Sequence, residues 1–431
     1  MLLVYSHKIT PRLTYIFKHI FVRILQIPVT FTTKVDEFVA HNGPKMTYTK
    51  APLGSEFFIR SYEILFEQGI NDVELNFAEW DNLPCFFLNK ENSIIPFDIF
   101  AASFYLLSRY EEYLPHVRDE HERFAADSSV AYKNKFLELP IIDVWAFKFL
   151  DILKEKFPDY TYKKRKFKQI STVDVDTAFA YKHRGVVRNL GGFVNDVVNA
   201  RFYNFWNRIM VLLKTRRDPF NTFKQILRLQ KSKQVETIFF FSIGDYTTFD
   251  QNISFRNNNF QSLIKSVADY ANIGIHPSYF TIGDVEKMKK EKLRLENIIN
   301  TTVTFSRQHY LRLKIPETYQ QLLDLDIEKD YTMGYAKYPG FRASTCTPFY
   351  FYDLDFEIQT PLKIVPFAVM DGTLKDYMRL SASESLQKIL ELKKIVKSVE
   401  GTFVTIIHNE TLSEINGWHG WREVYAKMLD D

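Results

Sequence analysis

The 431-residue chain contains only two cysteines, Cys85 and Cys346, which lie far apart in the sequence. Two distant cysteines provide neither the spacing of a cysteine-ligated metal site nor the framework of a disulfide-rich secreted domain. They therefore leave the redox compartment of the protein open.

The chain also lacks a strong charge of either sign, because 56 lysines and arginines are set against 52 aspartates and glutamates. A net charge of +4 gives no reason to expect a nucleic-acid partner, although a pI near 8.6 would not repel an anionic glycan. Hydrophobic residues make up 46% of the chain and aromatic residues 16%, which can supply a sizeable core. The length favours two domains.

A long uninterrupted apolar run is missing from the amino-terminal segment. Lys8, Lys18 and Arg23 interrupt it, so no apolar run reaches the ~20 residues that a membrane-spanning helix requires. The residue order of a secretory signal is absent as well. We therefore expect a soluble, cytoplasmic chain without a transmembrane segment. An amphipathic helix over residues 15–27 would allow peripheral membrane contact, and a helix or strand packed on the protein is the alternative.

Residues 1–160 are predicted to form an amino-terminal α+β accessory domain of unassigned role. In its clearest segment a helix is predicted to begin at Pro96, with apolar residues at helical spacing, and to end before a later proline. Arg109, Glu111 and Glu112 lie near the end of this helix. They form either a polar site or an ion-paired helix end, which contributes little to stability when it is exposed, and the second interpretation is favoured.

The basic stretch YKKRKFK, residues 162–168, is predicted to mark the junction with a second domain over residues 168–431. There, apolar strands alternate with helical segments, which favours a mainly parallel α/β sheet, open or closed into a barrel. The predicted strands are QISTVDVD, VETIFFFSIGDY, NIGIHPSY, TVTFSRQHY, LKIVPFAVMD and GTFVTIIHNE. An insertion at about 185–233 is predicted to be a helical hairpin with its lysines and arginines on the outer face.

Residues suited to acid–base and metal chemistry follow four of these strands. They are, in chain order, Asp174, Asp176, His276, Arg307, His309 and His408. Because ligands bind where the carboxyl ends of parallel strands converge, we expect these side chains to meet at one edge. A single histidine at such a place is usually a hydrogen-bonded core residue, but four strand ends of this kind favour a functional site.

Metal-assisted hydrolysis fits these residue types. A divalent ion accepts imidazole and carboxylate ligands, and an open position can hold a water whose pKa the metal lowers. A carboxylate outside the metal site can take the proton of that water, and a histidine on the opposite side can protonate the leaving group. An arginine beside the carboxylate would keep it ionised.

The order of these segments resembles that of the polysaccharide deacetylase family, the NodB-homology group of carbohydrate esterases (family 4-like). TVDVD is similar to the first family motif, NIGIHPSYF to the second, SRQHY to the third and TIIHN to the last. The resemblance covers about residues 168–431. IPFDIFAASFYLLSRYEEYL and GFRASTC further suggest a bacterial subgroup with an extra amino-terminal domain. The resemblance implies an α/β fold, namely a distorted (β/α) barrel with an additional α+β domain.

The resemblance also implies a role for each residue of the set. Asp174 would be the general base, Asp176 a metal ligand and His408 the general acid. Arg307, or Arg342 in GFRAS as a second candidate, would compensate the charge of Asp174. A surface or loop-bracing role is the alternative for Arg342.

The second motif departs from the family pattern H-[ST]-x-x-H. His276 supplies the first histidine as a metal ligand, but Phe280 stands where the second is expected. We expect His309 to replace it, since alternate residues of a strand point the same way and His309 lies two residues after Arg307. If His309 pointed into the core, the site would be short of a ligand. Zn²⁺ is the first expectation for the ion, and other divalent ions are alternatives.

Two further groups of residues are candidates for supporting roles. Asp330 and Asp371 lie near predicted strand ends and would orient a histidine. Trp418, His419 and Trp421 would form an apolar rim for a sugar ring, and packing of the carboxyl-terminal helix is the alternative.

The resemblance implies a metal-dependent deacetylase acting on an N-acetylated sugar of a bacterial surface polysaccharide or its precursor, a lipid-linked oligosaccharide included. Two alternatives stay open. One is a hydrolase of C–N bonds in a small non-sugar substrate, and the other is a catalytically silent glycan-binding or scaffold protein. The absent second histidine favours the silent protein, whereas a base and an acid together favour an enzyme. The sequence leaves the oligomeric state undetermined.

Overall fold

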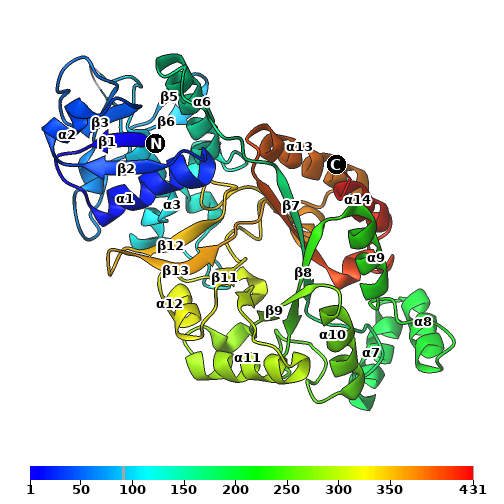
Figure 1. Cartoon of the computed structure of the whole chain (residues 1–431). Coiled ribbons are helices and arrows are strands. Elements are labelled where there is room, and N and C mark those ends of the chain that lie inside the picture. Colours follow the sequence, from blue (N-terminus) through cyan, green and yellow to red (C-terminus); the bar gives the residue numbers. More distant parts are fainter. Residues whose placement is uncertain (90–92, 431) are drawn as a thin grey trace.

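The computed structural model describes residues 1–89 and 93–430, and Asp431, the last residue of the predicted second domain, lies outside them. The chain has a mixed α/β architecture with two separate sheets of mainly parallel strands (Figure 1). None of the helices formed by the described residues combines the length and the apolar character needed to cross a membrane.

The amino-terminal sheet has four strands in the order β2-β1-β3-β4, and its three pairings are parallel. The strands are β1 (Leu2–Tyr5), β2 (Val29–Thr32), β3 (Lys45–Thr49) and β4 (Phe58–Arg60). Between β1 and β2 runs helix α1 (Pro11–Phe17), continued by the π-helical segment η1 (Lys18–Ile24), and α2 (Val35–Ala40) follows β2. Because parallel neighbours need such crossover connections, this part is an α/β arrangement rather than the predicted α+β one.

The segment considered for membrane contact is packed on the protein. Phe17 and Phe21 are completely buried, and the ring of Phe17 stacks on that of Phe100 at a centroid distance of 3.7 Å. Residues 15–27 therefore supply core side chains, and the packed alternative is the one observed.

The polypeptide then adds a small antiparallel pair and four helices. These are β5 (Ala78–Trp80), β6 (Leu83–Cys85), α3 (Ile99–Leu107), α4 (Tyr110–Tyr113), α5 (Val130–Lys133) and α6 (Ile141–Lys156). The predicted helix begins after Asp98 rather than at Pro96, because the Asp98 carboxylate accepts hydrogen bonds from the backbone N–H groups of Phe100 and Ala101. It breaks at Arg109, which has a left-handed backbone with φ of 56°.

The charged end of this helix is an ion-paired cluster, as favoured from the sequence, but it is buried rather than exposed. Arg109 binds Glu111 and Glu112 at 2.8 Å each, and Arg342, far along the chain, also binds Glu112. These ion pairs therefore form a buried network, and removal of one partner would lower the unfolding free energy strongly.

The second sheet has nine strands in the order β12-β13-β11-β10-β9-β8-β7-β15-β14. Every neighbouring pair is parallel except β12–β13. The strands are β7 (Lys168–Val175), β8 (Glu236–Ser242), β9 (Asn272–His276), β10 (Phe305–Ser306), β11 (Lys329–Asp330), β12 (Phe349–Asp353), β13 (Ile358–Ile364), β14 (Val369–Met370) and β15 (Thr402–His408). Closure of this sheet into a barrel stays a prediction.

Helices alternate with these strands. They are α7 (Val186–Val198), α8 (Phe202–Leu212), α9 (Phe223–Lys233), α10 (Asn258–Ala268), α11 (Val285–Ile299), α12 (Glu317–Asp324), α13 (Ala382–Ser398) and α14 (Trp421–Met428). Two strand predictions are wrong in part. TVTFSRQHY contains only the two residues of β10, and LKIVPFAVMD is divided between β13 and β14 at Pro366, which has no N–H for a ladder. Strand β12 was not predicted.

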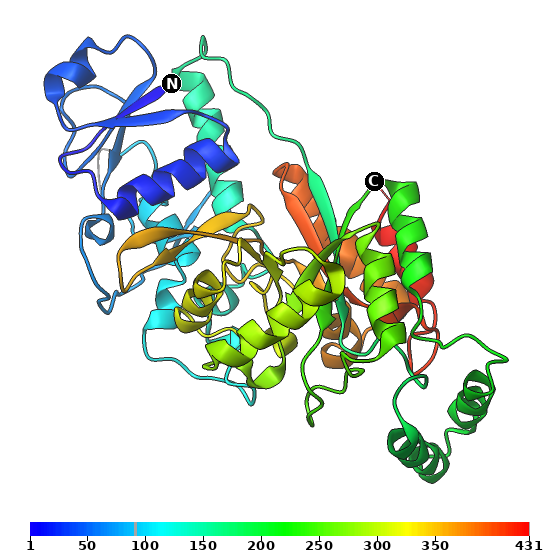
Figure 2. The ribbon, with the colours of Figure 1, turned by 60° about the horizontal axis from the view of Figure 1, so that its bottom comes forward.

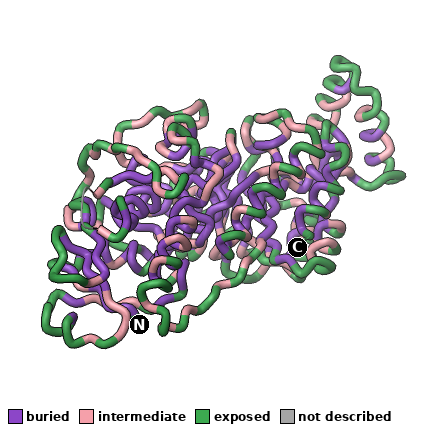
Figure 3. The backbone as a smooth tube through the Cα atoms, turned by 90° about the horizontal axis from the view of Figure 1, so that it is seen from above, coloured by how far each residue is buried: buried purple, intermediate pink, exposed green. Residues whose placement is uncertain are grey.

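The predicted insertion is a hairpin of α7 and α8 that projects from the rest of the chain (Figure 2). Helix α9 is not part of the hairpin, because its Phe223 and Ile226 are buried in the main core. The outer face of the hairpin is largely exposed (Figure 3) and carries valines, leucines and aromatic residues. The prediction that lysines and arginines would form this face is therefore incomplete.

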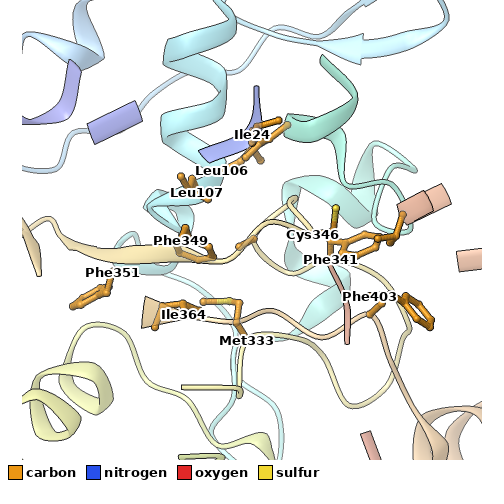
Figure 4. Close-up of a cluster of buried hydrophobic side chains, with 14 of the residues drawn as sticks. Ile24, Leu106, Leu107, Met333, Phe341, Cys346, Phe349, Phe351, Ile364 and Phe403 are labelled. Atoms are coloured by element: carbon orange, nitrogen blue, oxygen red, sulfur yellow. The ribbon is translucent and has the colours of Figure 1, made fainter. Parts of the chain in front are cut away.

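One apolar core runs through both predicted domains. Ile24, Leu106 and Leu107 belong to the same buried cluster as Met333 and Phe349 from the second part (Figure 4). The division at residues 160–168 stays a prediction, and the core is continuous across it.

Candidate metal centre

The carboxyl ends of the central strands bring the predicted residues to one cavity. Strands β7, β9 and β15 end at or next to Asp174, His276 and His408, and Asp174 lies opposite His408 in the ladder. Asp176 and His309, which follow β7 and β10, line the same cavity of about 360 Å³. Parallel strands explain this convergence, since their carboxyl ends share one edge.

Three of these residues form a group with the geometry of a metal site. The donor atoms of Asp176, His276 and His309 all lie within 4.8 Å of one another. Oδ1 of Asp176 is 3.2 Å from Nε2 of His276, and Oδ2 is 3.6 Å from Nε2 of His309. Oδ1 of Asp176 is buried and has no hydrogen-bond partner among the described residues. A buried carboxylate oxygen left without a donor fits a cation at this position.

The two imidazoles are oriented by hydrogen bonds from their other nitrogen. Nδ1 of His276 donates to the carbonyl oxygen of Arg307, and Nδ1 of His309 lies 2.8 Å from Oδ1 of Asp250. Both rings therefore turn Nε2 toward Asp176, as ligating histidines do. His309 does not reach this place through strand alternation, because it lies in the short 3₁₀ turn His309–Leu311 beyond β10.

Asp250 was missed in the sequence. It lies in the loop DYTTFDQN, eight residues after the last residue of β8, and is completely buried. The sequence does show that Asp250 is an acidic residue in the segment that follows a strand of the same sheet. Because it lies so far beyond the end of that strand, the sequence did not indicate that it belongs to the site.

The charges of the group reinforce one another. Burial disfavours an ionised Asp176, yet the neighbouring His309 and His276 hold the pKa of this carboxyl well below its usual range. Burial likewise disfavours a charged His309, but the carboxylates of Asp176 and Asp250 raise its pKa to about 9. A bound metal would compete with the proton on this imidazole.

Asp174 is held by an arginine, separately from the three grouped residues. Nη1 of Arg307 lies 3.3 Å from both carboxylate oxygens of Asp174, and its Nη2 donates to the hydroxyl of Thr172. Arg342 was the second candidate for this place, but the structure positions it elsewhere. Its guanidinium binds both carboxylate oxygens of Glu112 at 2.9 and 2.5 Å, which is the loop-bracing alternative.

His408 faces the cavity with one nitrogen and is anchored by the other. Its Nδ1 lies 2.8 Å from Oδ1 of Asp371, while its Nε2 is 3.7 Å from Oδ2 of Asp176. Burial opposes a charge on His408, but Asp371 raises its pKa well above the usual value. Asp371 thus orients a histidine as predicted. Asp330 does not, because it accepts hydrogen bonds from Ser306 and Thr332.

Aromatic side chains form part of the cavity wall. Phe249 stacks on Tyr279 with ring centroids 3.9 Å apart, and Phe249, Tyr310 and Trp418 line the cavity. Of the predicted rim only Trp418 is a lining residue, since Trp421 packs behind it in the core and His419 points to solvent.

The amino-terminal part also contributes to this wall. Arg123 lines the cavity, binds Asp119 and donates to the carbonyl oxygen of Tyr310 at 2.8 Å. The site is thus built from both parts of the chain.

Comparisons with known proteins cover each part separately. Residues 2–158 match a family of unknown function (DUF7033), and no curated protein matches the chain. Among solved structures, a putative polysaccharide deacetylase from Mycobacterium smegmatis is 14% identical and aligns 63% of this chain with 86% of its own at a TM-score of 0.40.

Two further solved structures are similar at lower scores. A CE4 family pseudoenzyme from Bacillus anthracis is 10% identical over 60% of this chain and 61% of its own, with a TM-score of 0.29. The polysaccharide deacetylase Bc1974 from Bacillus cereus is 12% identical over 61% and 86%, also with a TM-score of 0.29.

Proposed function

We propose that the chain is a metal-dependent hydrolase that removes the N-acetyl group from an N-acetylated sugar of a surface polysaccharide or its precursor. The observation that carries the proposal is the grouping of Asp176, His276 and His309 beside a separate Asp174–Arg307 pair. One cavity then holds a ligand set and a carboxylate base that is not part of it.

The ligand set suits a divalent ion. One carboxylate oxygen of Asp176 and the Nε2 atoms of His276 and His309 would hold it, and such mixed oxygen and nitrogen donors fit Zn²⁺ first among divalent ions. When bound, the ion lowers the pKa of a water ligand and polarises the amide carbonyl.

Asp174 is placed to act as the general base. Its Oδ2 lies 3.9 Å from Nε2 of His276, so it borders the ligand set, and the guanidinium of Arg307 pairs with it and orients it. Asp174 would take a proton from water as the oxygen adds to the amide carbon.

His408 is placed to act as the general acid. Its Nδ1 is fixed by Asp371, and its Nε2 faces the cavity. Nε2 would give a proton to the sugar nitrogen as the C–N bond breaks, which releases acetate and leaves an amino sugar. The aromatic wall of Phe249, Tyr310 and Trp418 offers apolar faces for sugar rings.

A catalytically silent glycan-binding protein is the second candidate. Phe280, which stands where the family pattern has a histidine, favours it. Phe280 is 48% exposed and packs near Phe249, whereas His309 offers an imidazole nitrogen to the site. The ligand count is therefore restored from another segment, which favours the enzyme.

The test is metal content of the purified protein, measured beside acetate release from N-acetylated oligosaccharides. We expect about one divalent ion per wild-type chain and its loss in His276→Ala and in His309→Ala. His419→Ala is the matched control, because His419 is exposed and lies outside the cavity lining. A wild-type chain that binds no divalent ion would overturn the hydrolase proposal, and metal without acetate release would favour the silent protein.

A further inference from the structure

The hairpin of α7 and α8 exposes large apolar side chains that a water-facing hairpin would bury. Nine of them are each more than half exposed, namely Val186, Val187, Leu190, Val194, Val197, Val198, Phe202, Tyr203 and Trp206. Figure 3 shows the hairpin as a mostly exposed projection. Contiguous apolar surface of this kind marks an interaction site rather than ordinary solvent-facing surface.

The exposed apolar residues follow helical spacing. Val187, Leu190, Val194 and Val198 are separated by three, four and four residues, which places them on one face of α7. Each of them is exposed, so the apolar face of α7 points away from the rest of the chain.

The two helices of the hairpin enclose a buried ion pair beside the rings of Phe193 and Phe205. Nε and Nη2 of Arg208 donate to Oδ2 of Asp196 at 3.0 and 2.9 Å, and both side chains are buried. Gly192 makes room for this pair, because a Cβ there would meet the Arg208 guanidinium at 2.4 Å. A helix in water usually turns its apolar face inward, whereas here the valines of α7 face outward and an ion pair is buried between the helices.

The hairpin and the segments that flank it are also basic. Residues 182–217 contain eight lysines and arginines and one acidic residue, Asp196, whose charge is paired with Arg208. Arg201, Lys214 and Arg216 are exposed. The net charge of the whole chain is only +4, so this segment concentrates the positive charge beside the apolar face.

We propose that the α7–α8 hairpin docks on the surface of an anionic phospholipid bilayer. The valines and Trp206 would enter the boundary between headgroups and acyl chains, and the exposed basic residues would bind lipid phosphates. The helices have 13 and 11 residues, a length suited to lying along the bilayer surface. The combination of apolar face and positive charge favours a lipid surface over a protein partner.

Docking would bring the cavity close to the bilayer. Arg188 donates to the carbonyl oxygen of Asn252, and Asn204 donates to the side-chain oxygen of Asn416. Gln251 precedes Asn252 in the chain and lines the cavity, so the hairpin is fixed to the loops of the cavity edge. The membrane proposal does not depend on the proposed reaction.

The experiment is flotation of the full chain with vesicles of phosphatidylcholine mixed with phosphatidylglycerol, and with phosphatidylcholine alone. We expect binding to the anionic vesicles that weakens with added salt. The double variant Leu190→Gln/Trp206→Gln should partition at least about tenfold more weakly, because each side chain contributes apolar transfer free energy. Tyr270→Gln/Phe356→Gln is the matched control, since these residues are also exposed but lie outside the hairpin.

A measurement on the unaltered side chains guards against a variant that misfolds. Trp206 is 63% exposed, so its fluorescence in the wild-type chain should shift to the blue and be quenched by bromine-labelled acyl chains. Absence of wild-type binding to anionic vesicles would overturn the proposal, and so would equal binding by the hairpin and control variants. If the wild-type chain does not bind vesicles but forms a dimer, and the hairpin variant does not form this dimer, the apolar face instead binds a second copy of the chain.

Discussion

Nδ1 of His309 lies 2.8 Å from Oδ1 of Asp250, a completely buried carboxylate from the loop after a different strand. This contact turns Nε2 of His309 toward Asp176, the place at which we propose that it binds the metal. The orientation of the imidazole therefore depends on a residue outside every motif.

Asp250→Asn should weaken metal binding about 10–100-fold, because the imidazole of His309 loses the carboxylate that orients it and increases its basicity. Zinc titration with a competing chelator measures this. Asp245→Asn is the control, since Asp245 lies in the same loop but is exposed and binds Arg294. Equal affinities in the two variants would show that Asp250 has no such role.

Asp174→Asn should keep the metal and lose activity. An amide cannot accept the proton of water, so kcat should fall about 10²–10⁴-fold, the range of a general base. Metal content and acetate release are measured on the same preparation. Loss of the metal together with the activity would instead assign Asp174 to the ligand set.

Arg342→Ala should destabilise the fold without emptying the metal site. Burial raises the pKa of Glu112, but Arg342 and Arg109 together lower it to about 2. The substitution removes one of these two partners, so that the buried carboxylate of Glu112 keeps only Arg109. Breaking such a buried pair costs about 3–5 kcal/mol of unfolding free energy. Urea unfolding tests the cost, and metal per folded chain should match the wild type. A variant that is as stable as the wild type but inactive would instead indicate that Arg342 takes part in the reaction.

His19 should make the protein sensitive to acid. Burial lowers its pKa to about 3, because neither ring nitrogen has a partner among the described residues and Arg23 repels the charge. The unfolded chain takes up a proton near pH 6.5 and the folded chain does not, so the unfolding free energy should fall below pH 6.5. The slope of this contribution is at most about 1.4 kcal/mol per pH unit.

His19→Leu should remove this contribution and flatten the pH dependence of urea unfolding between pH 6.5 and pH 4. His419→Leu, which changes an exposed histidine, should keep the wild-type dependence. A wild-type slope in His19→Leu would mean that His19 gains a partner or solvent contact on folding.

Much of the second sheet could be predicted from local sequence. Apolar runs and helical spacing identify β7, β8, β9 and β15 with the helices between them, because strands and helices impose different periods on the chain. The same runs place Asp174, His276 and His408 at strand ends. A two-residue strand such as β10 is too short to show the alternation of a strand. The strand predicted over TVTFSRQHY was therefore too long.

The sequence by itself determined which residue types follow the strands of the second sheet, and that α7 and α8 are helices. Only the tertiary structure decided that Asp250 orients His309, that Arg342 belongs to Glu112, and that the hairpin turns its apolar face outward. Periodicity is a property of neighbouring residues, so it is present in any short window of sequence. Which side chains meet across 59 or 230 residues depends on how the whole core packs, and no short window contains that information.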